Sequence, residues 1–347
     1  MKKIFLLLPS LLGIFFLSAC TTFFINQNGQ LVFGRNYDWV TDAGMVNTNQ
    51  RGLIKTSMPT NNGKSISWIS NYGSITFNQY GKEFPTGGMN EKGLVVELMW
   101  LDVTVYPSAD DRPAIGVLQW IQYQLDNSSN IDEVIATDKI LRIGAIGNTP
   151  LHYLIADANG NAATIEFLSG KMIVHKGATL SQPVLTNSTY EESLRSLSNV
   201  NLVAGNNSLE RFQTACNMIK NMSPITSNRP LNDQAFEILD KVAQGSFTKW
   251  SIVYDPKNKM ISFKTNRFRE IKNISFSSFD FSCAVTPKSW DMNQKGKGSV
   301  DKLFGNFNNL ENKKIIETAI NESSGRVTIS NESKDALCKY PEEIKCK

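Results

Sequence analysis

Short segments with alternating apolar and polar residues occur in three groups along the chain, and a pair of helices separates each group from the next. The first group begins with a hairpin, residues 21–26 and 30–35, around Asn28-Gly29, two residues that tolerate a positive φ. This order of strands and helix pairs predicts an α+β fold in which two antiparallel sheets pack face to face with helices outside. No stretch resembles a linker, so residues 20–347 are expected to form one domain.

The same periodicities place the other elements. A helix is predicted over residues 113–126, because apolar residues recur at helical spacing from Ile115 to Leu125 after Pro113. Further helices are predicted over residues 130–140, 208–222 and 233–242, and further strands over residues 65–70, 74–78, 94–101, 151–156, 162–167, 171–176, 250–255 and 260–265. From about residue 290 to residue 347 the chain is polar and rich in Lys, Asn and Ser. We expect this C-terminal segment to be loosely packed.

Residues 1–19 have the layout of a secretory signal peptide. Lys2 and Lys3 form a basic start, residues 4–17 are apolar, and Ser18-Ala19 places small residues before Cys20. The apolar run is too short for a lasting membrane span, and no later stretch reaches the necessary length. We therefore expect an exported protein, periplasmic or secreted, that is cut between Ala19 and Cys20.

Composition narrows the classes of function. Removing Lys2 and Lys3 lowers the formal charge from +4 to +2, which does not favour a nucleic-acid partner. The chain has 5 Cys and 2 His, and the cysteine spacings match no zinc signature, so neither a metal nor another cofactor is expected. Both histidines, His152 and His175, lie in strand patterns without a partner acid in view and are interpreted as structural.

Export permits disulfides among the remaining cysteines. Cys338 and Cys346 are close enough in sequence to close a small loop, but the pattern does not decide the pairing among Cys216, Cys283, Cys338 and Cys346. Cys216 falls within a helical pattern, which is typical of a small buried apolar residue rather than a reactive thiol.

A cysteine at the mature N-terminus carries a nucleophile and a base on one residue. A thiol has a reference pKa of about 8.5 and an α-amine one of about 7.7–8.0, so the amine of Cys20 can accept the thiol proton near neutral pH. Residues 17–20 also fit a bacterial lipoprotein cleavage site, at which the thiol is alkylated by diacylglycerol. That use of Cys20 would abolish the catalysis and leave a lipid-anchored protein.

The sequence that follows Cys20 favours the catalytic interpretation. Residues 20–39 read CTTFFINQNGQLVFGRNYDW and residues 88–94 read GMNEKGL. Further matches, in the same order, are LHY at 151–153 with Asp157 and Gly160, LTNS at 185–188, SLERF at 208–212 and WSIVYD at 250–255. Together they resemble the choloylglycine hydrolase family of N-terminal nucleophile (Ntn) hydrolases, which includes bile salt hydrolases and penicillin V acylases. The resemblance covers residues 20 to about 265 and implies a four-layer αββα sandwich.

The resemblance also implies a role for each of five residues. Cys20 aligns with the nucleophile, and Arg35 would favour its thiolate form. Asp38 matches the aspartate that holds the N-terminal amine. Asn187 matches the residue whose amide donates to the oxyanion, and Arg211 matches a second active-site arginine.

Three further positions need their own interpretation. Trp100 stands where family members carry Asn or Tyr, so we expect its backbone N–H to serve the oxyanion and its ring to line the acyl pocket. Asn90, in the GMNEKGL motif, is interpreted as a turn former. Between Asn187 and Arg211 the chain lacks much of the loop that drives tetramer assembly in many members, so a homo-oligomer is left open.

These residues together predict hydrolysis of a linear amide in a small-molecule N-acyl conjugate through a thioester. Trp100, with Trp39 and Phe24 expected nearby, favours a flat or long apolar acyl group. Penicillin V or an N-acyl homoserine lactone is therefore ranked before conjugated bile salts. The alternative from another class is a lipid-anchored lipoprotein that binds acylated ligands without turnover. Such a binder has no chemical need for the set of Arg35, Asp38, Asn187 and Arg211.

Overall fold

The computed structural model describes residues 20–60, 63–144, 149–199, 203–222 and 229–347. The predicted signal peptide, residues 1–19, lies outside the described residues. Among the helices of the described ranges, none is long and apolar enough to cross a membrane.

Two large sheets form the centre of the molecule. The seven-stranded sheet has the order β14-β1-β2-β15-β16-β17-β19, and the nine-stranded sheet has the order β13-β12-β11-β8-β7-β6-β3-β18-β20. Neighbouring strands pair antiparallel in both sheets except for the parallel pair β17–β19. The bounds of the first sheet are β1 Thr21–Gln27, β2 Gln30–Asp38, β14 Val184–Leu185, β15 Thr248–Asp255, β16 Met260–Thr265, β17 Lys272–Ser275 and β19 Gly298–Ser299. Those of the second are β3 Met45–Asn49, β6 Ser74–Asn78, β7 Pro85–Asn90, β8 Val95–Trp100, β11 Leu151–Ala156, β12 Ala162–Leu168, β13 Lys171–Lys176, β18 Lys288–Asp291 and β20 Gly305–Asn306.

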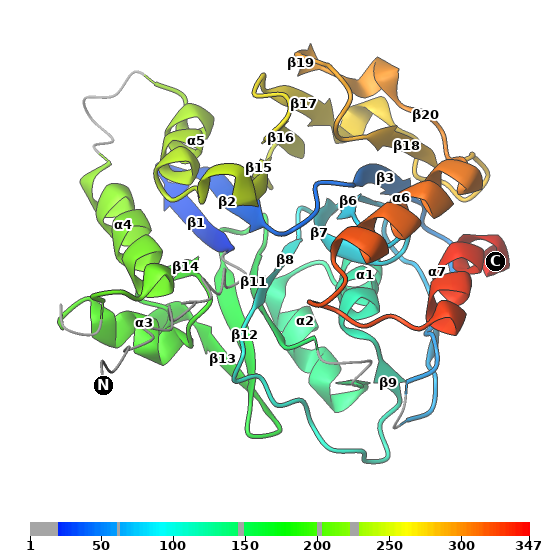
Figure 1. The fold of residues 1–347 in the computed structure, drawn as a ribbon, viewed down its shortest axis with the longest axis horizontal. Helices are drawn as coiled ribbons and strands as arrows, with labels where there is room; N and C mark the ends of the chain where they lie inside the picture. The colour runs from blue at the N-terminus through cyan, green and yellow to red at the C-terminus, as the bar shows by residue number, and fades with distance from the viewer. Residues whose placement is uncertain (1–19, 61–62, 145–148, 200–202, 223–228) are drawn as a thin grey trace, which may run out of the picture.

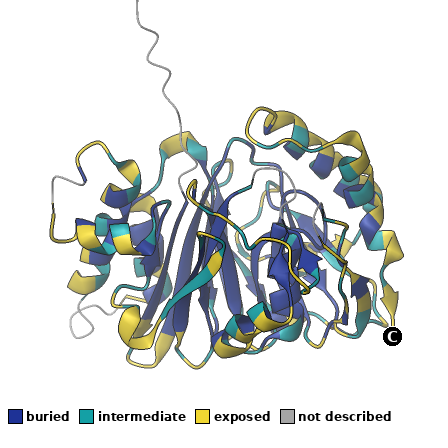
Figure 2. Cartoon of the chain, turned by 90° about the horizontal axis from the view of Figure 1, so that it is seen from below, coloured by how far each residue is buried: buried dark blue, intermediate teal, exposed yellow. Residues whose placement is uncertain are grey.

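Helices cover the outer faces of this pair of sheets. Helices α4 (Asn207–Asn221) and α5 (Leu231–Lys241) pack on β1, β2 and β15, whereas α1 (Val117–Asn127) packs on β7 and β8. Figure 1 shows α3 (Tyr190–Ser196) with α4 and α5 on one side, and α6 (Asn309–Glu322) with α7 (Asn331–Glu343) on the opposite side. The strands between them are largely buried, as the dark blue ribbons of Figure 2 show. The predicted four-layer α+β sandwich is confirmed.

The core that joins the two sheets is rich in aromatic side chains. Phe33 and Phe77 each lie edge to face with Tyr254, with ring centroids 6.0 and 6.1 Å apart. Burying one such side chain contributes roughly 1.5–3 kcal/mol. Gly34 has a specific reason to be glycine, because a Cβ there would lie 2.2 Å from Cζ of Phe23 on the paired strand.

The predicted elements were largely found, with shifted ends. The β1–β2 hairpin turns at Asn28 and Gly29, both with positive φ, as predicted. Helix α1 begins at Val117 rather than 113, because Ala114–Ile115 forms strand β9 beside β10 (Arg142–Ile143). Helix α2 (Ile131–Ala136) is shorter than predicted and continues as a 3-10 turn over Thr137–Lys139.

The prediction of a loosely packed C-terminal segment is wrong. Trp290 and Met292 are buried in the core between the sheets, and Ile316 and Ala319 on α6 are fully buried. The apolar residues are sparse there, but they share one face of each helix. That pattern is enough to dock a helix although the overall composition is polar.

The disulfide of the described residues joins Cys283 to Cys346, not Cys338 to Cys346. Cys338 is a free thiol on the inner face of α7, within the apolar cluster around Phe84. Cys346 instead lies on the short strand β21 (Lys345–Cys346), which pairs with β4 (Leu53–Thr56). Cys216 is buried in the main core, as predicted.

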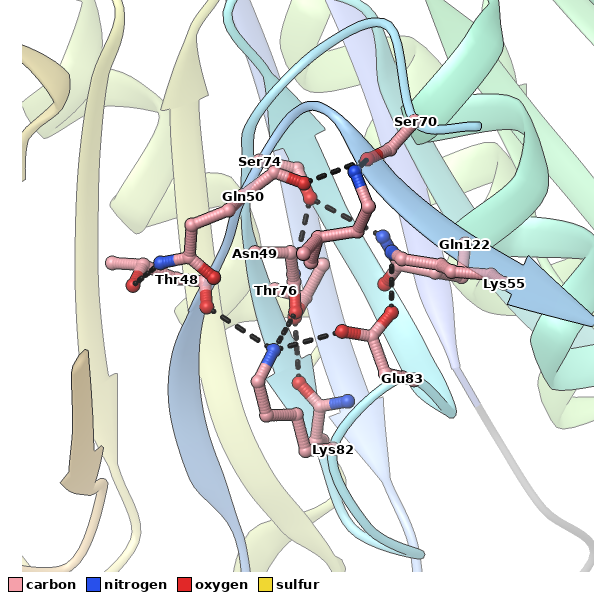
Figure 3. Close-up of polar contacts among 12 residues, drawn as sticks. Thr48, Asn49, Gln50, Lys55, Ser70, Ser74, Thr76, Lys82, Glu83 and Gln122 are labelled. Atoms are coloured by element: carbon pink, nitrogen blue, oxygen red, sulfur yellow. Dashed lines mark hydrogen bonds and ion pairs between the residues drawn. The ribbon is translucent and has the colours of Figure 1, made fainter. Parts of the chain in front are cut away.

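A cluster of four buried charges lies beside the second sheet. The ammonium of Lys55 bonds Glu83 at 2.6 Å and Asp126 at 2.8 Å. Figure 3 shows the ammonium of Lys82 between Asn49 at 2.7 Å and Glu83 at 2.8 Å. We call Lys55, Lys82, Glu83 and Asp126 the lysine cluster. The cluster has no net charge. Its ion pairs connect the turn that precedes β7 with strand β4 and helix α1.

Candidate active site

Cys20 directly precedes strand β1 and is 3% exposed. Its thiol lies 3.9 Å from the backbone carbonyl oxygen of Asp38, at the end of the neighbouring strand β2. Burial raises the pKa of the thiol, Arg35 opposes that rise and Asp38 adds to it. The hairpin predicted from sequence thus brings Cys20, Arg35 and Asp38 together.

Arg35 is fully buried between the sheets. Its guanidinium donates to the backbone carbonyls of Thr86 at 2.9 Å and Leu98 at 3.2 Å, and it forms an ion pair with Glu97. Burial lowers its pKa and Glu97 raises it, and the net shift is upward. Its side chain is therefore held as a cation close to the thiol.

Glu97 is a site residue that the sequence reasoning missed. Burial raises the pKa of this carboxyl group to about 7 against the opposing effect of Arg35. The hydroxyl of Tyr254 also donates to Glu97. A Cβ at Gly87 would lie 1.9 Å from the Glu97 carboxylate, so glycine there makes room for the ion pair. The sequence feature that could have identified Glu97 is an acidic residue within the otherwise apolar segment VVELMW.

Asp38 is buried without a full set of partners. Among the described residues, neither of its carboxylate oxygens has a hydrogen-bond partner in good geometry. Burial raises its pKa to about 7, while Arg211 and the nearby Thr248 side chain act in the opposite direction. Few buried carboxylates lack partners, because desolvating an unpaired charge is costly.

Arg211 on α4 connects the nucleophile to the oxyanion candidate. Its Nη1 donates to the carbonyl oxygen of Cys20 and, at 2.6 Å, to Oγ1 of Thr21. Its Nη2 donates to Oδ1 of Asn187 at 2.9 Å. The amide nitrogen of Asn187 in turn donates to the backbone carbonyl of Trp100 at 2.8 Å. The sequence-predicted residues are thus linked into one cluster.

Two polar residues of the second sheet lie against the loop that carries Asn187. His152 lies 3.3 Å from Glu166 through Nδ1 and 2.8 Å from the carbonyl oxygen of Thr186 through Nε2. The expectation that His152 has no partner acid is therefore wrong. Adjacent antiparallel strands place His152 on β11 and Glu166 on β12 close together, a register that the sequence did not reveal. His175 packs its ring against Tyr190, 4.7 Å between centroids.

Asn90 acts as a turn former, as predicted. Its side-chain oxygen accepts from the backbone N–H groups of Lys92 and Leu94, both at 3.0 Å. Its amide group donates to the carbonyls of Leu125 and Ser128, which ties the turn to the end of α1.

An apolar cavity of about 180 Å³ opens beside Cys20. We call it the acyl cavity. Trp39 and Trp100 line it, with ring centroids 5.9 Å apart. The expected part of the Trp100 ring in binding an acyl group stays a prediction. The indole N–H of Trp100 donates to Asp102 at 2.6 Å. Phe24 was expected beside the same cavity but lines a different hollow, together with Ile25, Asn26 and Gln27 further along β1.

Among the described residues no group of three or more His, Cys, Asp and Glu side chains lies close enough to hold a metal ion. The chemistry available in the site is that of a thiol, two guanidinium groups, two carboxyl groups of raised pKa and an amide donor.

Known proteins share both sequence and fold with this chain. The model of the choloylglycine hydrolase family, described as linear amide C–N hydrolases, matches residues 20–213, more than half of the chain. Penicillin V acylase of Pectobacterium atrosepticum is 31% identical over 183 residues, which are 46% of this chain and 48% of that protein. This match thus spans about half the length of that relative.

Solved structures extend the likeness. Penicillin V acylase from Agrobacterium tumefaciens superposes with a TM-score of 0.72 at 25% identity, covering 83% of this chain and 98% of that one. A single-residue variant of conjugated bile acid hydrolase from Clostridium perfringens has a TM-score of 0.65 at 20% identity, with coverage of 81% and 98%, and shares the fold. By its family match and its Ntn-hydrolase fold, the chain belongs to the choloylglycine hydrolase family of linear amide C–N hydrolases.

Proposed function

We propose that the chain is an amidohydrolase that uses Cys20, freed by removal of residues 1–19, to cleave the linear amide bond of small N-acyl conjugates through a thioester. The observation that carries this proposal is the Asp38 carboxyl group, which is buried beside Cys20 and has neither oxygen in a hydrogen bond of good geometry to any described residue. In the full chain the Cys20 nitrogen belongs to a peptide bond with Ala19 and carries no charge. Cleavage creates an α-ammonium group at this position, and it is the cation that Asp38 lacks.

The same cleavage alters the thiol. Burial alone raises its pKa, and Arg35 and Arg211 offset only part of that rise. A new ammonium group within the same residue adds positive charge and favours the thiolate. Maturation would therefore supply the partner of Asp38 and activate the nucleophile in one step.

The proposed reaction has two stages. In the first, the thiol proton has passed to the amine of Cys20, which gives the ammonium group beside Asp38, and the thiolate sulfur attacks the acyl carbon. The resulting ammonium protonates the leaving nitrogen as the C–N bond breaks, leaving a thioester. In the second stage the free amine takes a proton from water, the hydroxide attacks the thioester, and the C–S bond breaks to return the thiol and release the carboxylic acid.

Asn187 is proposed to stabilise the oxyanion of both stages. Its amide group has two N–H donors, and one of them bonds the carbonyl of Trp100. The second donor remains for the substrate, and Arg211 holds the amide oxygen so that the donors face the site. The role expected for the backbone N–H of Trp100 stays a prediction.

The size of the acyl cavity favours particular acyl groups. Its volume of about 180 Å³ is close to the roughly 150 Å³ of an engineered cavity that binds benzene. A phenoxyacetyl group or an unbranched acyl chain suits that space better than a four-ring steroid. We therefore rank penicillin V and N-acyl homoserine lactones before conjugated bile salts.

Activity of the mature protein tests the proposal. We expect hydrolysis of penicillin V or a long-chain acyl homoserine lactone to exceed that of glycodeoxycholate, with nearly complete loss in Cys20→Ser. Retained activity in Cys20→Ser would remove the thiol from the mechanism, and a clear preference for the bile salt would reverse the ranking.

The sequence of residues 17–20 favours a second candidate, a lipid-anchored binder of acylated ligands. Acylation of the Cys20 amine would leave Asp38 without its cation, and alkylation of the thiol would remove the nucleophile, so we propose export without anchoring. The intact mass of the protein from its native host separates the two candidates. An unmodified Cys20 terminus supports the enzyme, and the added mass of diacylglycerol supports the anchor.

A further inference from the structure

We propose that residues 327–337, the segment that ends on α7, form the distal wall of the acyl cavity and set the length of the acyl group that the enzyme accepts. The inference rests on the proposed function and adds a determinant of specificity to it. This segment, which we call the distal wall, lies far beyond residue 213, where the family match ends.

The cavity is closed by residues from opposite ends of the chain. Cys20 and the aromatic side chains of Trp39 and Trp100 line it near the nucleophile. The distal wall contributes Val327, Thr328, Ile329, Ser333 and Leu337. A substrate whose carbonyl carbon lies at the Cys20 sulfur and whose acyl group fills this cavity would contact these five residues.

The wall is anchored to the body of the protein by its flanking helix. On α7, the hydroxyl of Tyr340 donates to the carbonyl of Thr56 at 2.8 Å, and the ring packs against Phe84 with centroids 5.1 Å apart. The backbone N–H of Lys82 also donates to Asn312 of α6 at 2.9 Å. A wall held in this way can reject a chain that is too long, because the side chains cannot simply move aside.

The lysine cluster gives these anchors a rigid base. Glu83 accepts from both Lys55 and Lys82 (Figure 3). Phe84, the next residue, lines the acyl cavity. The turn that supports α7 is therefore fixed by buried ion pairs, one residue from the cavity surface.

A second chain of contacts connects the wall to the aromatic side of the cavity. The indole N–H of Trp39 donates to the hydroxyl of Tyr80 at 3.0 Å, and that hydroxyl donates to Ser323 at 3.1 Å. Ser323 follows α6 and precedes the distal wall by a few residues. Both sides of the cavity are thus fixed to the same part of the C-terminal region.

The chemistry of the lining defines the class of acyl group. None of the described residues that line the cavity is charged, and the wall adds apolar side chains with two hydroxyl groups. An uncharged, mainly apolar acyl group fits this surface, whereas a carboxylate at its far end would be desolvated without a partner.

A series of N-acyl p-nitroanilides, from acetyl to dodecanoyl, tests the inference in the mature full-length enzyme. We expect Leu337→Ala and Ile329→Ala to raise kcat/KM for dodecanoyl relative to hexanoyl by about tenfold, since each added methylene is worth at least that much in a tight pocket. Ile329→Trp should lower the same ratio by about tenfold and leave the acetyl substrate unaffected. Leu310→Ala is the matched control, because Leu310 lies on α6 with 61% exposure and does not line the cavity.

The outcomes separate this inference from the proposed function. An active wild-type enzyme whose chain-length profile is the same in all three wall variants overturns the inference and leaves the function standing. If the wild type hydrolyses no anilide and no penicillin V, the proposed function is rejected. The role of the distal wall is then tested separately by calorimetric titration with octanoate. Weaker octanoate binding in Ile329→Trp than in Leu310→Ala supports the wall, and equal binding overturns it.

Discussion

Two buried clusters of charge lie in this protein, and they differ in how completely their members are partnered. In the lysine cluster, Lys55 and Lys82 each bond oxygens on every side, and Asp126 also accepts from Trp68 at 2.8 Å. Around Cys20, both oxygens of Asp38 and the Nε of Arg35 have no partner in good geometry among the described residues.

The contrast appears between Glu83 and Asp38, although burial also raises the pKa of Asp126 in the lysine cluster. Burial tends to raise the pKa of Glu83, but Lys55 and Lys82 outweigh it and lower the pKa to about 2. For Asp38, the effect of burial outweighs the opposing effect of Arg211, and the pKa of its carboxyl group rises to about 7. A buried charge cluster that is complete stabilises one arrangement, whereas an incomplete one marks a place where another charged group belongs.

The largest effect expected from this contrast is on catalysis. Asp38→Asn in the mature enzyme should lower kcat/KM by about 10³- to 10⁴-fold, a range typical of replacing a buried aspartate that orients a catalytic base. Thermal stability should fall as well, because the α-ammonium group of Cys20 loses its buried carboxylate partner. Steady-state kinetics and the melting temperature measure the two quantities, and Asp233→Asn on the exposed side of α5 is the control. Near-normal kcat/KM would remove Asp38 from the site.

Stability against pH should separate the uncut chain from the mature one. In a chain that keeps Ala19, Asp38 has a folded pKa of about 7 against 3.8 unfolded, so the folded state binds the extra proton between these values. Its unfolding free energy therefore falls as pH rises from about 4 to 7, by up to about 4 kcal/mol. The mature chain should lose less, because its ammonium group lowers the pKa of Asp38.

Urea unfolding at several pH values measures this difference. Asp38→Asn in the uncut chain isolates the contribution of Asp38 from that of Glu97, whose pKa is also raised to about 7. Equal pH slopes in the uncut and mature chains would contradict a charge pair between Asp38 and the freed terminus.

Breaking the complete cluster should affect folding and not chemistry. Glu83→Gln leaves Lys55 and Lys82 without their shared carboxylate, and we expect a loss of about 3 kcal/mol in the free energy of unfolding. Glu237→Gln removes the exposed pair with Arg229 and should change stability by less than about 1 kcal/mol. Per folded molecule, kcat of Glu83→Gln on penicillin V should stay near the wild-type value, and a drop of 100-fold would place the cluster in the catalytic machinery.

The smallest effect is expected at Glu97, which acts through Arg35. Glu97→Gln should lower kcat/KM by roughly 10-fold through loss of the ion pair that orients the guanidinium. Removal of a negative charge near Arg35 also leaves more positive potential at the thiol, so the acidic limb of the pH profile should move to lower pH. A fall in activity without that shift would indicate a merely structural role.

Local patterns made part of this architecture predictable. The β1–β2 hairpin follows from alternation and from Asn28-Gly29, and once it forms, Arg35 and Asp38 must lie near Cys20. Asn187 and Arg211 were found through motif resemblance, since no local rule brings a loop and a helix to the same strand end. Glu97 was missed because alternation alone does not reveal that an acid will meet an arginine across two sheets.

The C-terminal region was misjudged for a different physical reason. Its composition is polar, but packing depends on which residues share a face, and Ile316 with Ala319 is enough to dock α6. The pairing of Cys283 with Cys346 depends on the path of the chain between them, which spacing does not encode.

The acyl cavity also has a consequence for biosynthesis. Cys20 is synthesised more than three hundred residues before Leu337. Through most of translation the chain therefore contains the nucleophile but not the residues that complete the cavity. A nascent or prematurely stopped chain would display a thiol hairpin without any enclosure for an acyl tail. The proposed selectivity needs both Cys20 and the distal wall, so it can arise only after residue 337 has been synthesised.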